Sequence, residues 1–168
     1  YNEKQLEKKK KQEPFKPELN PLNPKEKESI AAQWFSAIAH MHHHGYMHRD
    51  IKVENALWIP DTGKLLVFDF GLGMFLTQNK DYSSRGTLVY AAPEILSRGI
   101  GHDLSVDVWS MAVLVYVLFI SSKGKLVYPF GDDTSLDALS PAEKEAMFNE
   151  TIRKIKRVEF TNLLSTQD

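Results

Sequence analysis

Two short apolar runs joined by a turn place the tightest restriction on the fold. The runs are residues 56–59 and 65–68, and the turn between them, residues 60–63, reads Pro-Asp-Thr-Gly. Apolar runs of this length around Pro, Asp and Gly predict a β-hairpin. In an antiparallel hairpin the residue before the first strand and the residue after the second lie at the same open end, so we expect Asn55 and Asp69 to be neighbours.

A helix is predicted before the hairpin, from about residue 24 to residue 44. Asn23 is a capping residue, Pro24 suits the first helical position, and Glu26 is placed to return the capping bond. Apolar residues then follow at helical spacing: Ile30, Trp34, Ile38 and Met41. Gly45 favours a C-terminal cap.

The end of this helix is rich in histidine. His40 and His44 are four residues apart and share a face, but Met41 stands where the zinc-protease pattern requires Glu. No third ligand follows in register. We therefore interpret His40, His42, His43 and His44 as solvated or partly packed side chains.

Composition excludes several classes of protein. The formal net charge of −1 gives no bulk attraction to nucleic acid or to an anionic membrane, and the absence of cysteine excludes disulfides and thiolate zinc sites. The longest apolar stretch, residues 111–120, is shorter than the ~20 residues that a membrane span needs, so we expect a buried helix. From these features we expect an intracellular, cytoplasmic location.

Residues 1–23 are dominated by Lys, Glu, Pro and Asn, and we interpret them as a charged linker or insert. Residues 24–168 form the folded unit.

The open end of the hairpin gathers the residues that carry chemistry. Asp50 enters it one loop earlier, and Lys52 places a cation beside Asp50. The amide oxygen of Asn55 and the carboxylate of Asp69 are hard ligands of the kind that Mg²⁺ prefers. A base, a cation and two metal ligands together indicate phosphoryl transfer.

Three motifs resemble those of the eukaryotic protein kinases. His48-Arg49-Asp50 with Asn55 resembles the catalytic loop, Asp69-Phe70-Gly71 the metal-binding DFG motif, and Ala92-Pro93-Glu94 the APE motif. The resemblance covers about residues 24–160. It implies a protein kinase-like α+β fold, here a partial and mainly helical C-terminal lobe whose short hairpin carries the catalytic loop and the DFG motif. Lys52 and Gly86-Thr87 resemble the serine/threonine branch.

The resemblance implies a role for each site residue. Asp50 orients the substrate hydroxyl or accepts its proton, Lys52 stabilises the transferring phosphoryl group, and Asn55 and Asp69 hold Mg²⁺ or Mn²⁺. The residues implied in binding ATP are Lys52, Glu54, Asn55, Leu57 and Asp69, with Leu57 under the adenine ring. Glu54 also matches a position that can select basic substrates.

Other residues are implied in support or regulation. His48 and Phe70 are expected to pack in an internal hydrophobic spine. Asp107 is expected to accept hydrogen bonds from the backbone around His48 and Arg49. Arg49, Glu94 and Asp107 are thus structural supports, and the Arg that ordinarily pairs with Glu94 lies beyond the chain.

The activation segment, residues 69–94, contains Thr77, Tyr82, Ser83 and Ser84. Ser83 and Thr87 are the segment residues assigned to activation and substrate docking. A phosphate on Ser83 would find Arg49 as its partner and order the segment.

No Gly-rich phosphate loop and no Val-Ala-Ile-Lys strand occurs in the sequence. We therefore expect an N-terminal lobe upstream, and little activity from these residues alone. Residues 129–130 and a predicted helix over 141–157 loosely match a region that docks protein substrates and partners. Two alternatives stay open: a pseudokinase-like scaffold or binding fragment, and a small-molecule phosphotransferase.

Overall fold

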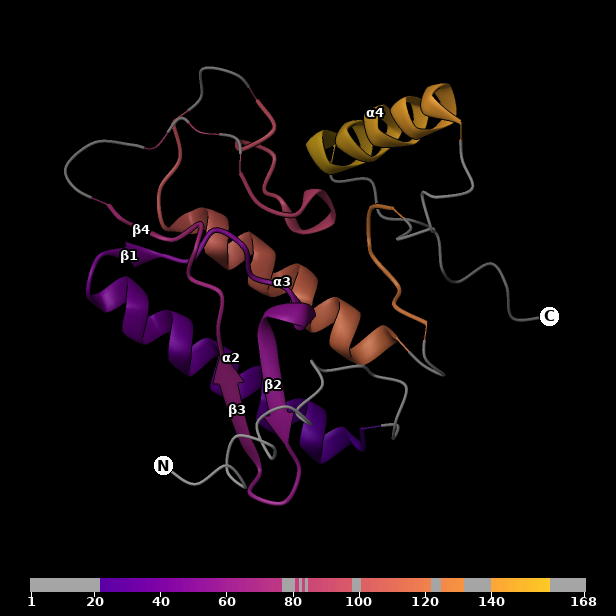
Figure 1. Ribbon diagram of the computed structural model, residues 1–168. Helices are drawn as coiled ribbons and strands as arrows, with labels where there is room; N and C mark the ends of the chain where they lie inside the picture. Colours follow the sequence, from indigo (N-terminus) through magenta and orange to yellow (C-terminus); the bar gives the residue numbers. More distant parts are fainter. Residues whose placement is uncertain are drawn as a thin grey trace, which may run out of the picture.

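The computed structural model describes residues 22–76, 81, 83, 85–97, 101–121, 125–131 and 140–157. The described elements are, in chain order, α2 (Pro24–His43), β1 (Tyr46–Met47), the 3-10 turn η1 (Val53–Asn55), β2 (Ala56–Ile59), β3 (Lys64–Val67), β4 (Met74–Phe75), the 3-10 turn η2 (Leu88–Tyr90), α3 (Ser105–Ile120) and α4 (Pro141–Arg157). Helix α2 contacts both α3 and β3, so the two helices and the hairpin form one packed unit (Figure 1).

Helix α2 begins with the predicted cap. The Asn23 side chain accepts a hydrogen bond from the Glu26 N–H at 3.0 Å, and the Glu26 carboxylate accepts one from the Asn23 N–H at 2.8 Å. The helix ends at His43, one residue before the predicted end, and Gly45 follows with φ +70°. The prediction of this helix is confirmed. It could be made from the sequence because the capping residues lie within a few positions of each helix end.

The predicted hairpin is formed by β2 and β3. Ala56 pairs with Val67 and Ile59 with Lys64, so β3 begins one residue earlier than the apolar run indicates. The Phe68 N–H donates to the Asn55 carbonyl at 3.0 Å and extends the ladder to the open end. Gly63 has φ +60°, a conformation that a turn of this kind requires and that glycine adopts at little cost.

The hydrophobic core lies between α2, α3 and the inner face of the hairpin. Trp34 of α2, Leu114 and Val117 of α3, and Ala56 of β2 are each at most 2% exposed. Helix α3 is thus the buried helix that its apolar sequence predicts. Every helix in the described ranges is too short or too polar to span a bilayer.

A second small sheet joins the chain before His48 to the chain after Gly71. Tyr46 of β1 pairs with Phe75 of β4, and Met47 pairs with Met74. The Leu76 N–H also donates to the Gly45 carbonyl at 2.7 Å. Because β1 leads directly into His48, this sheet holds the segment that follows Met47 beside the segment that precedes Met74 (Figure 1).

The predicted helix over 141–157 is confirmed as α4. Ile155 is fully buried and belongs to the main core. Thr151 packs against Gly131 so closely that a Cβ added at Gly131 would lie 2.9 Å from the Thr151 hydroxyl oxygen. Phe130 stacks on Trp109 of α3, with ring centroids 5.5 Å apart.

Candidate active site

The carboxylate of Asp50 lies at the centre of a polar cluster. Asp50 is buried, with 8% of its surface exposed. Its Oδ2 accepts hydrogen bonds from Lys52 Nζ at 2.7 Å and Asn55 Nδ2 at 3.1 Å. Its Oδ1 accepts from the Thr87 hydroxyl at 2.7 Å and from the Thr87 N–H at 3.1 Å. Both carboxylate oxygens therefore have fixed positions.

These bonds also decide the charge of Asp50. Burial alone would raise the pKa of the Asp50 carboxyl, but the hydrogen bonds from Lys52, Thr87 and Asn55 outweigh it and hold the pKa below its usual range. Asp50 is consequently ionised at neutral pH. Its four hydrogen bonds fill the lone-pair sites of a carboxylate, so a further donor must take the place of one of them.

Thr87 reaches Asp50 because two backbone segments approach each other closely. A Cβ added at Gly86 would lie only 2.6 Å from the Arg49 carbonyl oxygen, and Gly86 has φ +108°. Glycine is therefore required at this position. The Thr87 hydroxyl also accepts a hydrogen bond from Lys52 Nζ at 3.0 Å, so Asp50, Lys52 and Thr87 form a closed ring of contacts.

Asn55 and Asp69 flank the open end of the hairpin. Asn55 is 4% exposed, and its Nδ2 donates to the Asp50 carbonyl at 2.8 Å as well as to the Asp50 carboxylate. Asp69 is exposed, has φ +63°, and follows directly after Phe68, whose N–H is bonded to the Asn55 carbonyl. The Asp69 carboxylate accepts the Gly71 N–H at 3.3 Å, which fixes the bend that carries it.

The donor set at this end fits a hard divalent cation. Within the described ranges, no group of three or more His, Cys, Asp or Glu side chains is arranged to hold a metal. The amide of Asn55 and the carboxylate of Asp69 would be the two protein ligands, with the rest of the shell left to water and phosphate oxygens. Mg²⁺ binds in this manner in phosphoryl-transfer sites. The described histidines offer no competing metal site.

The backbone of His48 and Arg49 is anchored by Asp107 of α3. Asp107 is fully buried, its Oδ2 accepts the His48 N–H at 2.8 Å, and its Oδ1 accepts the Arg49 N–H at 2.9 Å. These are the bonds expected from the sequence. Arg49 has φ +66°, a conformation that is unfavourable for a side-chain-bearing residue, and the bond to its N–H helps to hold it there.

His42 is a third donor to Asp107, and its interpretation as a solvated or partly packed histidine missed this contact. Its Nε2 lies 2.9 Å from Asp107 Oδ2, and its side chain is 17% exposed. The sequence did hold a signal, since Trp34, Ile38 and His42 are four residues apart and share the buried face of α2. His40, His43 and His44 are exposed, as expected.

His48 is fully buried, in agreement with its expected packing role. Its ring contacts that of Trp34 at a centroid distance of 6.2 Å and that of Phe70 at 5.3 Å. Phe70 itself is 47% exposed, so one face of its ring packs on His48 and the rest of the side chain is open to solvent.

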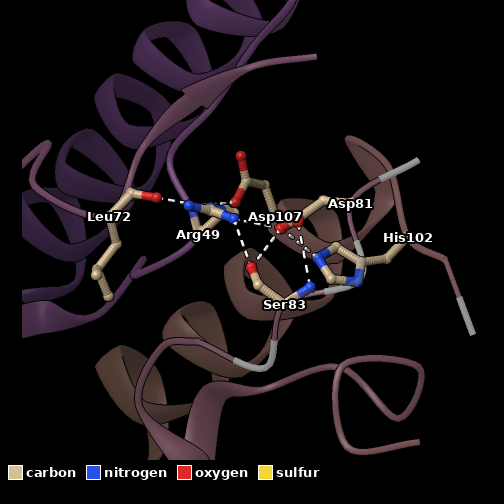
Figure 2. A network of polar contacts seen from close by, with 6 residues as sticks. All are labelled: Arg49, Leu72, Asp81, Ser83, His102 and Asp107. Carbon is tan, nitrogen blue, oxygen red and sulfur yellow. Dashed lines mark hydrogen bonds and ion pairs between the residues drawn. The ribbon is translucent and has the colours of Figure 1, made fainter. Parts of the chain in front are cut away.

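Arg49 connects the loop that carries Asp50 to the segment after Gly71. Figure 2 shows its guanidinium between the Leu72 carbonyl and the side chains of Asp81 and Ser83. Arg49 Nη1 donates to the Ser83 hydroxyl at 3.0 Å. Ser83 thus lies beside Arg49 as the sequence predicts, whereas Thr77, Tyr82 and Ser84 lie outside the described residues.

The remaining predicted residues do not take part in the ring of contacts among Asp50, Lys52 and Thr87. Glu54 is half-buried and close enough to Tyr90 that, together with burial, its charge raises the pKa of that phenol. Leu57 is half-buried opposite Leu66 in the hairpin. Glu94 is half-buried, and its carboxylate forms no ion pair within the described ranges.

Comparisons with known proteins match the chain to protein kinases. The family model described as "Protein kinase domain" matches residues 3–163. The chain is 43% identical over 102 residues to serine/threonine-protein kinase AtPK1/AtPK6 of Arabidopsis thaliana, a match that covers 56% of this chain and 22% of the relative. It is 37% identical over 119 residues to protein kinase kin1 of Schizosaccharomyces pombe, covering 70% of this chain and 13% of the relative. The chain therefore spans a small part of the length of these relatives.

Proposed function

Because the chain belongs to the protein kinase family, we propose that it carries the reaction centre of a serine/threonine protein kinase. The reaction is the transfer of the γ-phosphoryl group of ATP to a Ser or Thr hydroxyl of a protein. The observation that carries the proposal is the buried Asp50 carboxylate held by Lys52, Thr87 and Asn55. The names of the relatives, which include serine/threonine protein kinases, support it.

Asp50 orients the attacking hydroxyl. Its fixed, ionised carboxylate accepts the hydrogen bond of the substrate O–H and aims the oxygen at the γ-phosphorus. As the new O–P bond forms and the bond from phosphorus to the departing ADP oxygen breaks, the hydroxyl proton passes to Asp50.

Lys52 supplies positive charge beside the reacting atoms. Its Nζ is 2.7 Å from Asp50, and this proximity supports a role beside the transferring phosphoryl oxygens. Asn55 and Asp69 would hold Mg²⁺ or Mn²⁺, which neutralises phosphate charge when bound. Thr87 bonds to both Asp50 and Lys52 and so fixes their position relative to residues 86–94, the segment proposed to receive the protein substrate.

ATP would lie over the outer face of the hairpin, with Leu57 beneath the adenine ring and Glu54 nearby. Exposed apolar side chains lie on this face and directly after it, since Leu66 of β3 is 50% exposed and Phe68 is 38% exposed. We infer that a further lobe outside this chain covers the face and completes the nucleotide cleft. Phosphoryl transfer by residues 1–168 alone would then be slow.

The test is phosphoryl transfer by the full-length protein to Ser- and Thr-containing peptides, with Mg²⁺ and ATP. Asp50→Asn removes the charge and the base at constant size and is expected to lower transfer by roughly 10²–10⁴-fold. The matched control is Asp61→Asn in the exposed hairpin turn, which should leave the rate within twofold.

ATP binding by the Asp50→Asn variant should persist, because Asp50 acts on the hydroxyl. Transfer by Asp50→Asn at the control rate would contradict the proposal. ATP binding with no transfer by the wild-type protein would instead favour a pseudokinase-like scaffold. Transfer only to small molecules would favour a small-molecule phosphotransferase.

A further inference from the structure

The bend that carries Asp69 is closed by two bonds of its own. The Asp69 carboxylate accepts the Gly71 N–H at 3.3 Å, and the Gly73 N–H donates to the Phe70 carbonyl at 2.9 Å. Asp69 has φ +63°, a conformation that residues with side chains rarely adopt and that surrounding contacts must hold. Asp69 and Phe70 are also exposed, so burial contributes little to holding them. The geometry of the bend therefore depends on contacts from neighbouring segments.

Tyr46 of β1 makes such a contact. Its hydroxyl donates a hydrogen bond to the Phe70 carbonyl at 3.3 Å. Phe75 of β4 holds the Tyr46 ring from a second side, in an edge-to-face contact with ring centroids 4.9 Å apart. Backbone pairing of Tyr46 with Phe75 also fixes the position from which the side chain starts. The hydroxyl thus reaches the bend from a strand that is itself fixed.

Gly73 makes room for the Tyr46 ring. A Cβ added at Gly73 would lie 2.5 Å from Cε1 and 2.6 Å from Cζ of that ring, closer than real side chains approach. The φ angle of Gly73 is not positive, so this position requires glycine for space and not for backbone conformation. Tyr46 and Gly73 are therefore a matched pair, in which the ring lies directly on the backbone of the bend.

One peptide group connects Tyr46 to Asp69. The carbonyl that accepts the Tyr46 hydroxyl and the N–H that donates to the Asp69 carboxylate belong to the same unit, between Phe70 and Gly71. Because a peptide group is planar, its carbonyl and its N–H cannot turn independently. A bond that fixes the carbonyl therefore also fixes the direction of the N–H, and with it the side chain of Asp69.

We propose that Tyr46 is a positioning residue that holds the Asp69 carboxylate in place for a divalent cation, acting through the peptide between Phe70 and Gly71. The proposal rests on the proposed function for the role of Asp69 as a ligand of Mg²⁺ or Mn²⁺. Removing a side chain that supports a metal ligand typically weakens metal binding about 10- to 100-fold. The hydroxyl bond of Tyr46 is long and exposed, so most of the effect should come from the ring.

The experiment measures ADP binding to the full-length protein by calorimetry, once with Mg²⁺ and once with EDTA. The ratio of the two affinities is the gain that the cation provides. Tyr46→Leu removes the ring and the hydroxyl and should lower this gain about tenfold, while the affinity in EDTA stays within about twofold of wild type. Tyr46→Phe removes only the hydroxyl and should lower the gain about two- to threefold. General damage to the fold would instead lower both affinities.

Two further variants set the limits of the scale. Asp69→Asn removes the charge of the ligand itself and should abolish most of the gain. Tyr116→Phe removes a hydroxyl from a half-buried tyrosine of α3, nine residues after Asp107, and should leave both affinities within about twofold of wild type.

Gly73→Ala tests the matched pair. In the wild type the new Cβ meets the Tyr46 ring, so the gain from Mg²⁺ should fall severalfold. In the Tyr46→Leu background it should cause no further fall, because a leucine side chain ends before the positions of Cζ and the hydroxyl oxygen. Losses that add in full in the double variant would contradict the pairing of Tyr46 with Gly73.

A gain in Tyr46→Leu equal to that of the wild type would overturn the proposal, and so would an equal loss of affinity in EDTA. If Tyr46→Leu does not fold, as judged by its thermal transition, the comparison of Tyr46→Phe with Tyr116→Phe decides. A wild-type protein that gains nothing from Mg²⁺ would refute the role of Asp69 in the proposed function, and the role of Tyr46 with it. Phosphoryl transfer does not enter these measurements, so their outcome is distinct from that of the Asp50→Asn test.

Discussion

Replacement of Asp107 by Asn should destabilise the protein by about 3 kcal/mol, because one buried, charge-assisted hydrogen bond is lost and its donor is left unpaired. The Asp107 carboxylate accepts the backbone N–H groups of His48 and Arg49 and also the His42 ring. An Asn side chain has a single acceptor oxygen. Its NH₂ group must therefore face either the Arg49 N–H or the donors of His48 and His42. Because NH₂ is itself a donor, it cannot accept a hydrogen bond from the group that it faces.

The loss is a large share of the ~5–15 kcal/mol by which such domains are stable. For a chain of this length it corresponds to a decrease in melting temperature of about 10 °C. Urea unfolding followed by tryptophan fluorescence measures it, and Trp34, whose ring is 6.2 Å from that of His48, lies close to the perturbed site. Circular dichroism should give the same midpoint.

The control is again Asp61→Asn in the exposed turn, where we expect a change within about 0.5 kcal/mol. His42→Leu should destabilise the wild type, and its effect should shrink in the Asp107→Asn background, because the two side chains share one contact. A loss below about 1 kcal/mol for Asp107→Asn would refute the reasoning. So would full additivity with His42→Leu.

Gly73→Ala should destabilise the protein by about 1–3 kcal/mol, because the new Cβ would lie 2.6 Å from Cζ of the Tyr46 ring; urea unfolding measures this, and a neutral result would show that the ring moves aside freely. Lys52→Met should lower phosphoryl transfer at least tenfold, with peptide kinetics as the assay and an unchanged rate as the contrary outcome. The pKa of Asp81 falls from 3.8 to about 2 on folding, so its stabilisation of about 2 kcal/mol is complete above pH 4 and disappears as the pH falls toward 2. The difference in unfolding free energy between wild type and Asp81→Asn should therefore shrink over that pH range, and a constant difference would exclude this linkage.

Elements with local signals were predictable from the sequence. The cap of α2 is made by residues three apart, and the β2–β3 hairpin is closed by a turn of four residues. Each element is therefore determined by a few consecutive residues. The position of Thr87 against Asp50 depends on a different kind of information. The two residues are 37 apart in sequence, and only resemblance to a family indicated that both belong to one site.

Contacts between distant segments were not predictable from pattern alone. His42 and Asp107 are 65 residues apart, and the sequence shows only that His42 shares a helix face with Trp34 and Ile38. The bridge between Asp81 and His102 joins two isolated residues with no strand pattern around either. Pairing of this kind is decided by the packing of α3 beneath the catalytic loop, which no local propensity encodes.

The close approach of Gly86 to the Arg49 carbonyl has a consequence for how the reaction centre is specified. Where these two stretches cross, backbone atoms face each other with no side chain between them. Their spacing is therefore set by the backbone, and it is possible only because residue 86 has no side chain. A single missing Cβ thus allows the Thr87 hydroxyl to lie beside Asp50.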